Sequence, residues 1–225
     1  MKEFALCFLA YGDEHIDEFN DVSKKILSTH PLSNIFVLTD DKSKIHNQSI
    51  NIFETQEEFN FNLKRCVISE AFKTYDTIIM LDTDVDIKSF QYISDIQLDG
   101  MYVKWIDPKL THKGTRLDMR NNQYGIELSK LNTHKTPIQF IPEFCIYLKI
   151  TDTKKRNQFI ERWDYIHKNI KKFEPTDRHA DLSGAIEGCI MYLTCMDLGL
   201  PITPSNKLFE SVTHYASIKF QKILI

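Results

Sequence analysis

The chain has 225 residues, with 28 basic and 31 acidic side chains that give a formal net charge of −3. Hydrophobic residues make up 42% and charged residues 26% of the sequence, close to the averages for globular proteins, which excludes disordered, coiled-coil and collagen-like chains. The small acidic excess argues against a nucleic-acid-binding protein, since such proteins carry a clear basic excess. We therefore expect one large domain with a sizeable core.

Apolar runs and cysteines bear on where the protein resides. No apolar run reaches the roughly 18 residues needed to cross a bilayer, and the run at residues 4–11 lacks the basic leader of a secretion signal. The five cysteines form no C-x-x-C pair, which argues against structural zinc and favours free, buried thiols in a reducing compartment. We expect a cytoplasmic protein without a membrane span.

The first half of the chain alternates between apolar runs and amphipathic repeats. The apolar runs predict buried strands at residues 4–9, 34–38, 49–53 and 77–81. Apolar residues that recur every three or four positions predict one helix after Asp13, which we expect to cap it, and another over residues 59–71. This alternation predicts an α/β fold, with a mostly parallel sheet flanked by helices.

The second half is less regular. Further strands are expected at residues 101–105 and 144–148, and further helices at residues 159–170 and 182–196. The last of these helices is expected to end at Gly199 and Pro201. Residues 107–135 are polar and charged, and we expect them to form an irregular excursion of the kind that often serves as a functional lid.

The sharpest chemical signal follows the strand at residues 77–81. Asp82, Asp84 and Asp86 stand two residues apart, so in an extended chain their side chains point to the same side. Three carboxylates in one place repel one another unless a cation such as Mg²⁺ or Mn²⁺ compensates them. Because open α/β sheets bind ligands at the carboxyl ends of their strands, we interpret these aspartates as a metal site. The alternative is a solvated turn.

Two segments together resemble a known family. Residues 64–84 place Arg65 17 residues before Asp82, and this stretch resembles the D-x-D region of glycosyltransferases with the GT-A fold, nearest to family 8 (glycogenin and bacterial lipopolysaccharide galactosyltransferases). Residues 214–220 are similar to the late H-Y-x-G-x-x-K-P-W segment of that family. They have a histidine and a lysine, with Lys219 five residues after His214 where the motif has six, and they lack its glycine, proline and tryptophan.

The resemblance implies a fold and an activity. It implies a single GT-A-like domain over residues 1–225, with a nucleotide-binding half at 1–105 and an acceptor-binding half at 106–225. The implied enzyme is a glycosyltransferase that moves a sugar from a nucleoside-diphosphate sugar, a UDP-sugar being favoured, to a glycan or other hydroxyl acceptor. The implied cofactor is Mn²⁺ or Mg²⁺. The oligomeric state is left open.

The resemblance also implies roles for single residues. The implied metal ligands are Asp82, Asp84 and His214. The residues expected to contact the donor are Ala10, Tyr11, Thr39, Asp40, Arg65, Asp82 and Lys219. Lys64 is as plausible as Arg65 in this set, and Tyr11 is either a stacking platform for the base or an aromatic residue at the edge of the core.

The sequence does not decide the stereochemistry of the transfer. An inverting reaction needs a carboxylate as general base. Glu187 and Asp181 are the first candidates for this base and Glu143 is the third. A retaining reaction needs no such base, and these carboxylates would then contact sugar hydroxyls.

Four other classes of protein are alternatives to this interpretation. A phosphatase of the haloacid dehalogenase type also carries D-x-D after a strand, but near the start of the chain and with a later G-D-x-x-x-D motif that is absent here. A nucleotidyltransferase would have a glycine-rich loop after its first strand. An EF-hand would have glycine and glutamate where Ile87 and Ile93 stand. A transferase-like protein that binds sugars without turnover also stays open.

Overall fold

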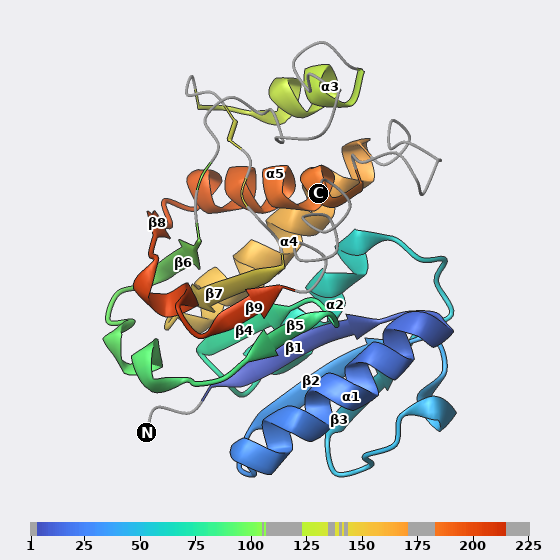
Figure 1. Ribbon diagram of the computed structural model, residues 1–225. Helices are drawn as coiled ribbons and strands as arrows, with labels where there is room; N and C mark the ends of the chain where they lie inside the picture. The colour runs from blue at the N-terminus through green and yellow to red at the C-terminus, as the bar shows by residue number, and fades with distance from the viewer. Residues whose placement is uncertain are drawn as a thin grey trace, which may run out of the picture.

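The computed structural model describes residues 4–104, 106, 123–134, 138–139, 141, 144–170 and 183–214. Within them the chain forms an α/β fold around a central sheet (Figure 1). None of the helices in these parts has the length and apolar character needed to cross a membrane.

The central sheet has seven strands in the order β3-β2-β1-β4-β7-β6-β8. Its strands are β1 (Ala5–Ala10), β2 (Asn34–Thr39), β3 (Asn51–Glu54), β4 (Thr77–Leu81), β6 (Gly100–Val103), β7 (Cys145–Lys149) and β8 (Ile202–Pro204). All neighbouring pairs are parallel except those of β7, which runs antiparallel to β4 and β6. The predicted mostly parallel sheet is thus confirmed.

Five helices and one further strand pair complete the described fold. The helices are α1 (Asp13–Thr29), α2 (Lys64–Phe72), α3 (Gln123–Leu131), α4 (Thr153–Ile170) and α5 (Ser183–Asp197). Strands β5 (Val85–Ile87) and β9 (Val212–His214) form a separate two-stranded ribbon. Short 3₁₀ helices lie at Lys42–Lys44, Phe61–Leu63, Gln91–Asp95 and Lys207–Phe209.

The sheet separates two hydrophobic clusters. Helices α2, α4 and α5 cover one face, where Trp163 of α4 is fully buried, and helix α1 covers the other face with the β5–β9 ribbon (Figure 1). Strand β1 supplies both clusters because its side chains alternate: Cys7 packs with α2 and α4, whereas Phe8 packs against α1. The sheet is therefore buried on both faces, as its near-continuous apolar strands predict.

Some expectations from the sequence are wrong in detail. Asp13 does not cap α1: Gly12 precedes the helix with a φ of 81°, which is costly for other residues, and no side chain caps the helix. Helix α3 lies inside the stretch expected to be irregular. The ribbon of β5 and β9 was not expected, because three-residue strands carry too little periodicity to be detected.

The cysteines follow the sequence prediction. All five are free thiols, and four of them are buried. Burial raises the pKa of the Cys7, Cys145 and Cys195 thiols, so these thiols stay protonated and pack as small apolar groups.

Candidate functional site

The candidate site lies at the edge of the sheet where the parallel strands β1, β2 and β4 end. Ala10 of β1 pairs with Thr39 of β2, and Leu81 of β4 pairs with Phe8 of β1. The residues that follow these strands therefore emerge along one edge. This edge is the place where open α/β sheets bind ligands.

The acidic segment after β4 is a turn. The backbone N–H of Val85 donates to the carbonyl oxygen of Asp82 at 3.3 Å, so the chain turns here and is not the extended segment on which the expected row of three aspartates was based. Asp82 and Asp84 remain half-exposed on the turn, whereas Asp86 lies half-exposed within β5. The turn thus keeps two adjacent carboxylates available at the edge of the sheet.

The residue between these aspartates anchors the turn to α1. Thr83 is 6% exposed, and its hydroxyl donates to Oε2 of Glu18 at 2.7 Å. The same hydroxyl oxygen lies 3.3 Å from Nδ1 of His15. This anchor leaves no signal in the sequence, because its side-chain contacts join residues that are far apart in the chain.

The β5–β9 ribbon brings the end of the described chain to the acidic turn. The antiparallel register sets His214 opposite Val85, the residue that directly follows Asp84. The backbone of His214, at the end of β9, therefore lies beside the turn, and Figure 1 shows β9 running alongside β5. The side chain of His214 is outside the described part of the structure.

A buried lysine lies behind the turn. The ammonium nitrogen of Lys64, at the start of α2, lies 2.6 Å from Oδ1 of Asp82, and the Lys64 side chain is 5% exposed. The backbone N–H of Asp82 donates to the carbonyl of Phe144 at 3.0 Å. Both the backbone and the carboxylate of Asp82 are therefore held in place.

Glu187 of α5 lies on the far side of the same lysine. Its side chain is fully buried, and Oε1 lies 3.4 Å from the ammonium nitrogen of Lys64. Neither carboxylate oxygen of Glu187 accepts a hydrogen bond from the residues described. Burial raises the pKa of Glu187 to about 8, the Lys64 charge opposes this rise and the Asp82 charge adds to it. Full burial behind Lys64 does not suit a base that must reach an acceptor.

Arg65 faces a different partner from its neighbour Lys64. Its guanidinium binds Oδ1 of Asp164 on α4 through Nε at 2.9 Å and through Nη2 at 2.8 Å. Arg65 and Asp164 line a cavity of about 590 Å³ between α2, α4 and the ends of β2 and β3, and neither Asp82 nor Asp84 lines it. Of the two basic residues weighed from the sequence, Lys64 is the one that contacts Asp82.

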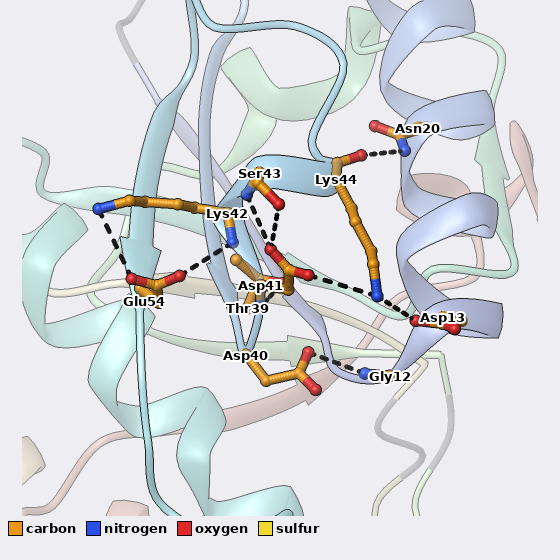
Figure 2. Close-up of polar contacts among 10 residues, drawn as sticks. All are labelled: Gly12, Asp13, Asn20, Thr39, Asp40, Asp41, Lys42, Ser43, Lys44 and Glu54. Carbon is orange, nitrogen blue, oxygen red and sulfur yellow. Dashed lines mark hydrogen bonds and ion pairs between the residues drawn. The ribbon is translucent and has the colours of Figure 1, made fainter.

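The ends of β1 and β2 are joined by polar contacts. Oδ1 of Asp40 accepts the backbone N–H of Gly12 at 2.9 Å (Figure 2). Thr39 is buried, and its hydroxyl oxygen accepts the N–H of Asp41 at 3.2 Å. Ala10 is fully buried at the end of β1. Thr39 thus supports the loop that carries Asp40.

Neighbouring charges brace the same edge. Asp41 caps the 3₁₀ helix at Lys42–Lys44 by accepting from the N–H and hydroxyl of Ser43, and Lys44 bridges Asp41 and Asp13 (Figure 2). The hydrogen bonds from Ser43 lower the pKa of Asp41, and Lys44 lowers it further. The loops after β1 and β2 are therefore connected to the start of α1.

Tyr11 lies at the edge of the core. Its hydroxyl donates to the carbonyl of Glu57 at 3.0 Å, and its ring packs against Phe59 with centroids 5.3 Å apart. These contacts agree with the core-edge alternative. Stacking of Tyr11 on a base stays a prediction.

Several predicted site residues lie outside the described part of the structure. They are Asp181, Glu143 and Lys219. Among the residues that the structure does describe, no three His, Cys, Asp or Glu side chains form a metal-binding cluster. Asp82 and Asp84 nevertheless offer the hard oxygen donors that Mn²⁺ and Mg²⁺ prefer, so the turn fits such a cation as part of a larger ligand set.

Fold and site together define a class of protein. No protein-family model matches the sequence, and no curated protein matches it significantly. The sheet and its covering helices are nevertheless those of the GT-A type, as the comparison with solved structures shows. The predicted resemblance to these glycosyltransferases, near family 8, is thus confirmed for the fold.

Two solved structures illustrate the likeness. The galactosyltransferase LgtC, in complex with donor and acceptor sugar analogs, matches with a TM-score of 0.50 at 14% identity, over 84% of this chain and 70% of LgtC. The bifunctional glycosyltransferase WbbM, in its apo form, matches with a TM-score of 0.58 at 12% identity, over 98% of this chain. The chain spans only 44% of WbbM.

Proposed function

We propose that the protein is a metal-dependent glycosyltransferase that moves a sugar from a nucleoside-diphosphate sugar, with UDP-sugars favoured, to a hydroxyl acceptor such as a glycan. One observation carries the proposal: two half-exposed aspartates stand on an anchored turn at the ligand-binding edge of a GT-A-type sheet, with the backbone of His214 beside them. The nucleotide-binding half is residues 1–105 and the acceptor-binding half is residues 106–225.

The proposed cofactor is Mn²⁺ or Mg²⁺, held by Asp82, Asp84 and His214. When bound, such a cation offsets the charge that develops on the departing nucleoside diphosphate. Thr83 keeps the two carboxylates in place through its hydrogen bond to Glu18. Lys219 adds positive charge to the diphosphate in this proposal.

The donor nucleotide is proposed to lie along the ends of β1 and β2. Ala10 is fully buried at the end of β1, and its proposed role is to place the loop that begins at Tyr11 against the donor. Within the described residues, Asp40 accepts one hydrogen bond, from Gly12, so its second oxygen is offered to a ribose hydroxyl. Tyr11 and Thr39 shape the loops on either side, and Arg65 approaches the donor from α2.

The general base, if the reaction inverts, is assigned to Asp181 in preference to Glu187. A base must reach the attacking hydroxyl directly or through one water. Glu187 is fully buried with Lys64 against it, which supports a positioning role. Asp181 precedes the same helix, α5, and Glu143 precedes β7, so both are candidates for the acceptor side.

The first prediction concerns nucleotide binding through the metal. A ligand that binds only the native state raises the thermal midpoint. We expect UDP or GDP to raise the midpoint with Mn²⁺ present and not without it, and Asp84→Ala to abolish the rise. The measurement is a thermal-shift titration of both nucleotides with and without Mn²⁺.

The control is Asp86→Ala, since Asp86 lies in β5 and not on the turn; this variant is expected to keep the shift. A rise of equal size without metal in wild type and Asp84→Ala contradicts the proposal. Release of phosphate from a phosphomonoester, with no sugar transfer from UDP-sugars, supports the phosphatase alternative. Binding without turnover identifies a sugar-binding relative.

A further inference from the structure

Lys64 is a lysine on the buried face of its helix. It stands three and four positions before Val67 and Ile68, both fully buried on α2. A buried ammonium group is costly unless a carboxylate compensates it. Asp82 provides this compensation at 2.6 Å, so Lys64 occupies part of the coordination capacity of a proposed metal ligand.

Glu187 is a second carboxyl within reach of the same ammonium group. It is fully buried, it lies 3.4 Å from the Lys64 nitrogen, and neither of its oxygens accepts a hydrogen bond from the described residues. A buried carboxyl without hydrogen bonds is rare and costly. Lys64 therefore lies between two carboxyls: Asp82, which it contacts closely, and Glu187, which accepts no hydrogen bond from the described residues.

We propose that Lys64 is a positioning residue that exchanges partners: it neutralises Asp82 in the metal-free protein and moves to Glu187 when a divalent cation takes up Asp82. The cation repels the ammonium group, and the unsatisfied oxygens of Glu187 receive it. This inference rests on the proposed function only for the identity of the displacing ligand. The exchange between the two carboxyls is a property of the chain itself.

The surroundings make the lysine the part that moves. The backbone of Asp82 is held by the carbonyl of Phe144 and by its own turn, and Glu187 projects from within α5. Lys64 has a flexible four-carbon stem. The ammonium group therefore changes partner by a small movement between two fixed carboxyls, and the acidic turn keeps its shape.

The decisive experiment needs no metal. It compares the thermal midpoints of wild type, Glu187→Gln, Asp82→Asn and the double variant in the presence of a chelator. In wild type, Glu187→Gln is expected to leave the midpoint unchanged or raise it, because Asp82 still compensates Lys64. In the Asp82→Asn background, Glu187 is the one of these two carboxyls that can still compensate the charge of Lys64. Glu187→Gln is then expected to lower the midpoint by more than about 4 °C.

The controls separate this exchange from a general loss of acidic charge. Glu70→Gln, which removes a half-exposed carboxylate of α2 paired with Lys73 just after the helix, is expected to have the same small effect in both backgrounds. An equal effect of Glu187→Gln in wild type and in Asp82→Asn overturns the exchange. If Asp82→Asn fails to fold, Asp82→Ser replaces it in the same comparison.

A second measurement tests the role of the cation. Calorimetric titration with Mn²⁺ alone is expected to show at least about fivefold weaker binding to Glu187→Gln than to wild type, because the carboxylate that receives the displaced ammonium group is then lost. Equal affinities overturn the role of Glu187 in metal binding. If wild type binds no Mn²⁺, the proposed metal site fails, and the chelator experiment still decides the exchange.

Discussion

At the scale of single residues, the site depends on which groups share one positive charge. Lys64 lies between Asp82 and Glu187, at 2.6 Å and 3.4 Å. A buried charge that loses its partner destabilises a protein more than the pair stabilises it. The acidic turn is therefore tied to the interior of α5 through one side chain, although Asp82 and Glu187 are far apart in the sequence.

The stability of the protein is expected to fall as pH rises. The folded state raises the pKa of Glu187 from 4.5 to about 8, so this carboxyl keeps its proton on folding. Its contribution is fully present below about pH 4.5 and is lost as pH rises towards 8, with a slope of at most about 1.4 kcal/mol per pH unit. Urea unfolding at pH 5, 6.5 and 8 measures this slope.

Glu187→Gln is expected to flatten the slope, since glutamine has no proton to lose. The variant is then more stable relative to wild type at pH 8 than at pH 5. Glu70→Gln, which replaces a half-exposed carboxylate on α2, should keep the dependence of unfolding free energy on pH that wild type shows. A slope that is the same in all three proteins would show that Glu187 ionises alike in the folded and unfolded states.

At the scale of elements, a buried hydrogen bond next to the site joins α4 to the 3₁₀ helix Phe61–Leu63, which leads directly into α2. The indole N–H of Trp163 on α4 donates to Oδ1 of Asn62 at 2.7 Å, and Asn62 lies two residues before Lys64. Both side chains are almost completely buried. The bond therefore fixes the start of α2, from which Lys64 reaches Asp82.

Loss of this bond is expected to destabilise the protein. Asn62→Ala leaves the indole N–H of Trp163 buried and unpaired, which costs about 1–3 kcal/mol of unfolding free energy. Urea unfolding measures the loss. Asn169→Ala on the exposed side of α4 removes only a contact to the Tyr165 carbonyl and is expected to change stability by about 0.5 kcal/mol or less. Equal losses in both variants would contradict a special role for Asn62.

At the scale of the whole molecule, the sheet supports two separate hydrophobic clusters. Ile16 of α1 belongs to one and Ile166 of α4 to the other, on opposite faces. Because the two residues belong to different clusters, we expect their contributions to the free energy of unfolding to be independent. The acidic turn lies at the end of β4, the strand that both clusters cover.

If the two clusters contribute independently, the losses of unfolding free energy caused by one substitution in each cluster should add. Ile16→Val and Ile166→Val are each expected to lower the unfolding free energy by about 0.5–1.5 kcal/mol. The double variant should show the sum within about 0.5 kcal/mol and unfold in one transition. Urea unfolding followed by tryptophan fluorescence and circular dichroism tests both points. A deviation well above that margin would show that the sheet couples the two faces.

Most elements could be predicted because they depend on local pattern. The apolar run at residues 77–81 and the spacing of buried residues in α4 follow from the periods of strands and helices. The D-x-D sequence likewise marked the end of β4 as the site. Its turn was only the alternative to an extended segment, because the backbone bond from Val85 to Asp82 has no strong sequence signal.

The sequence by itself predicted most of the strands and helices, the acidic segment after β4 and the likeness of the chain to GT-A glycosyltransferases. Only the tertiary structure decided that Lys64 and not Arg65 meets Asp82, that Glu187 is buried behind this lysine, and that β9 pairs with β5. The physical reason is the distance along the chain over which each property acts. Periodicity acts between neighbours in the chain, whereas the burial and charge of a side chain depend on groups that only folding brings together.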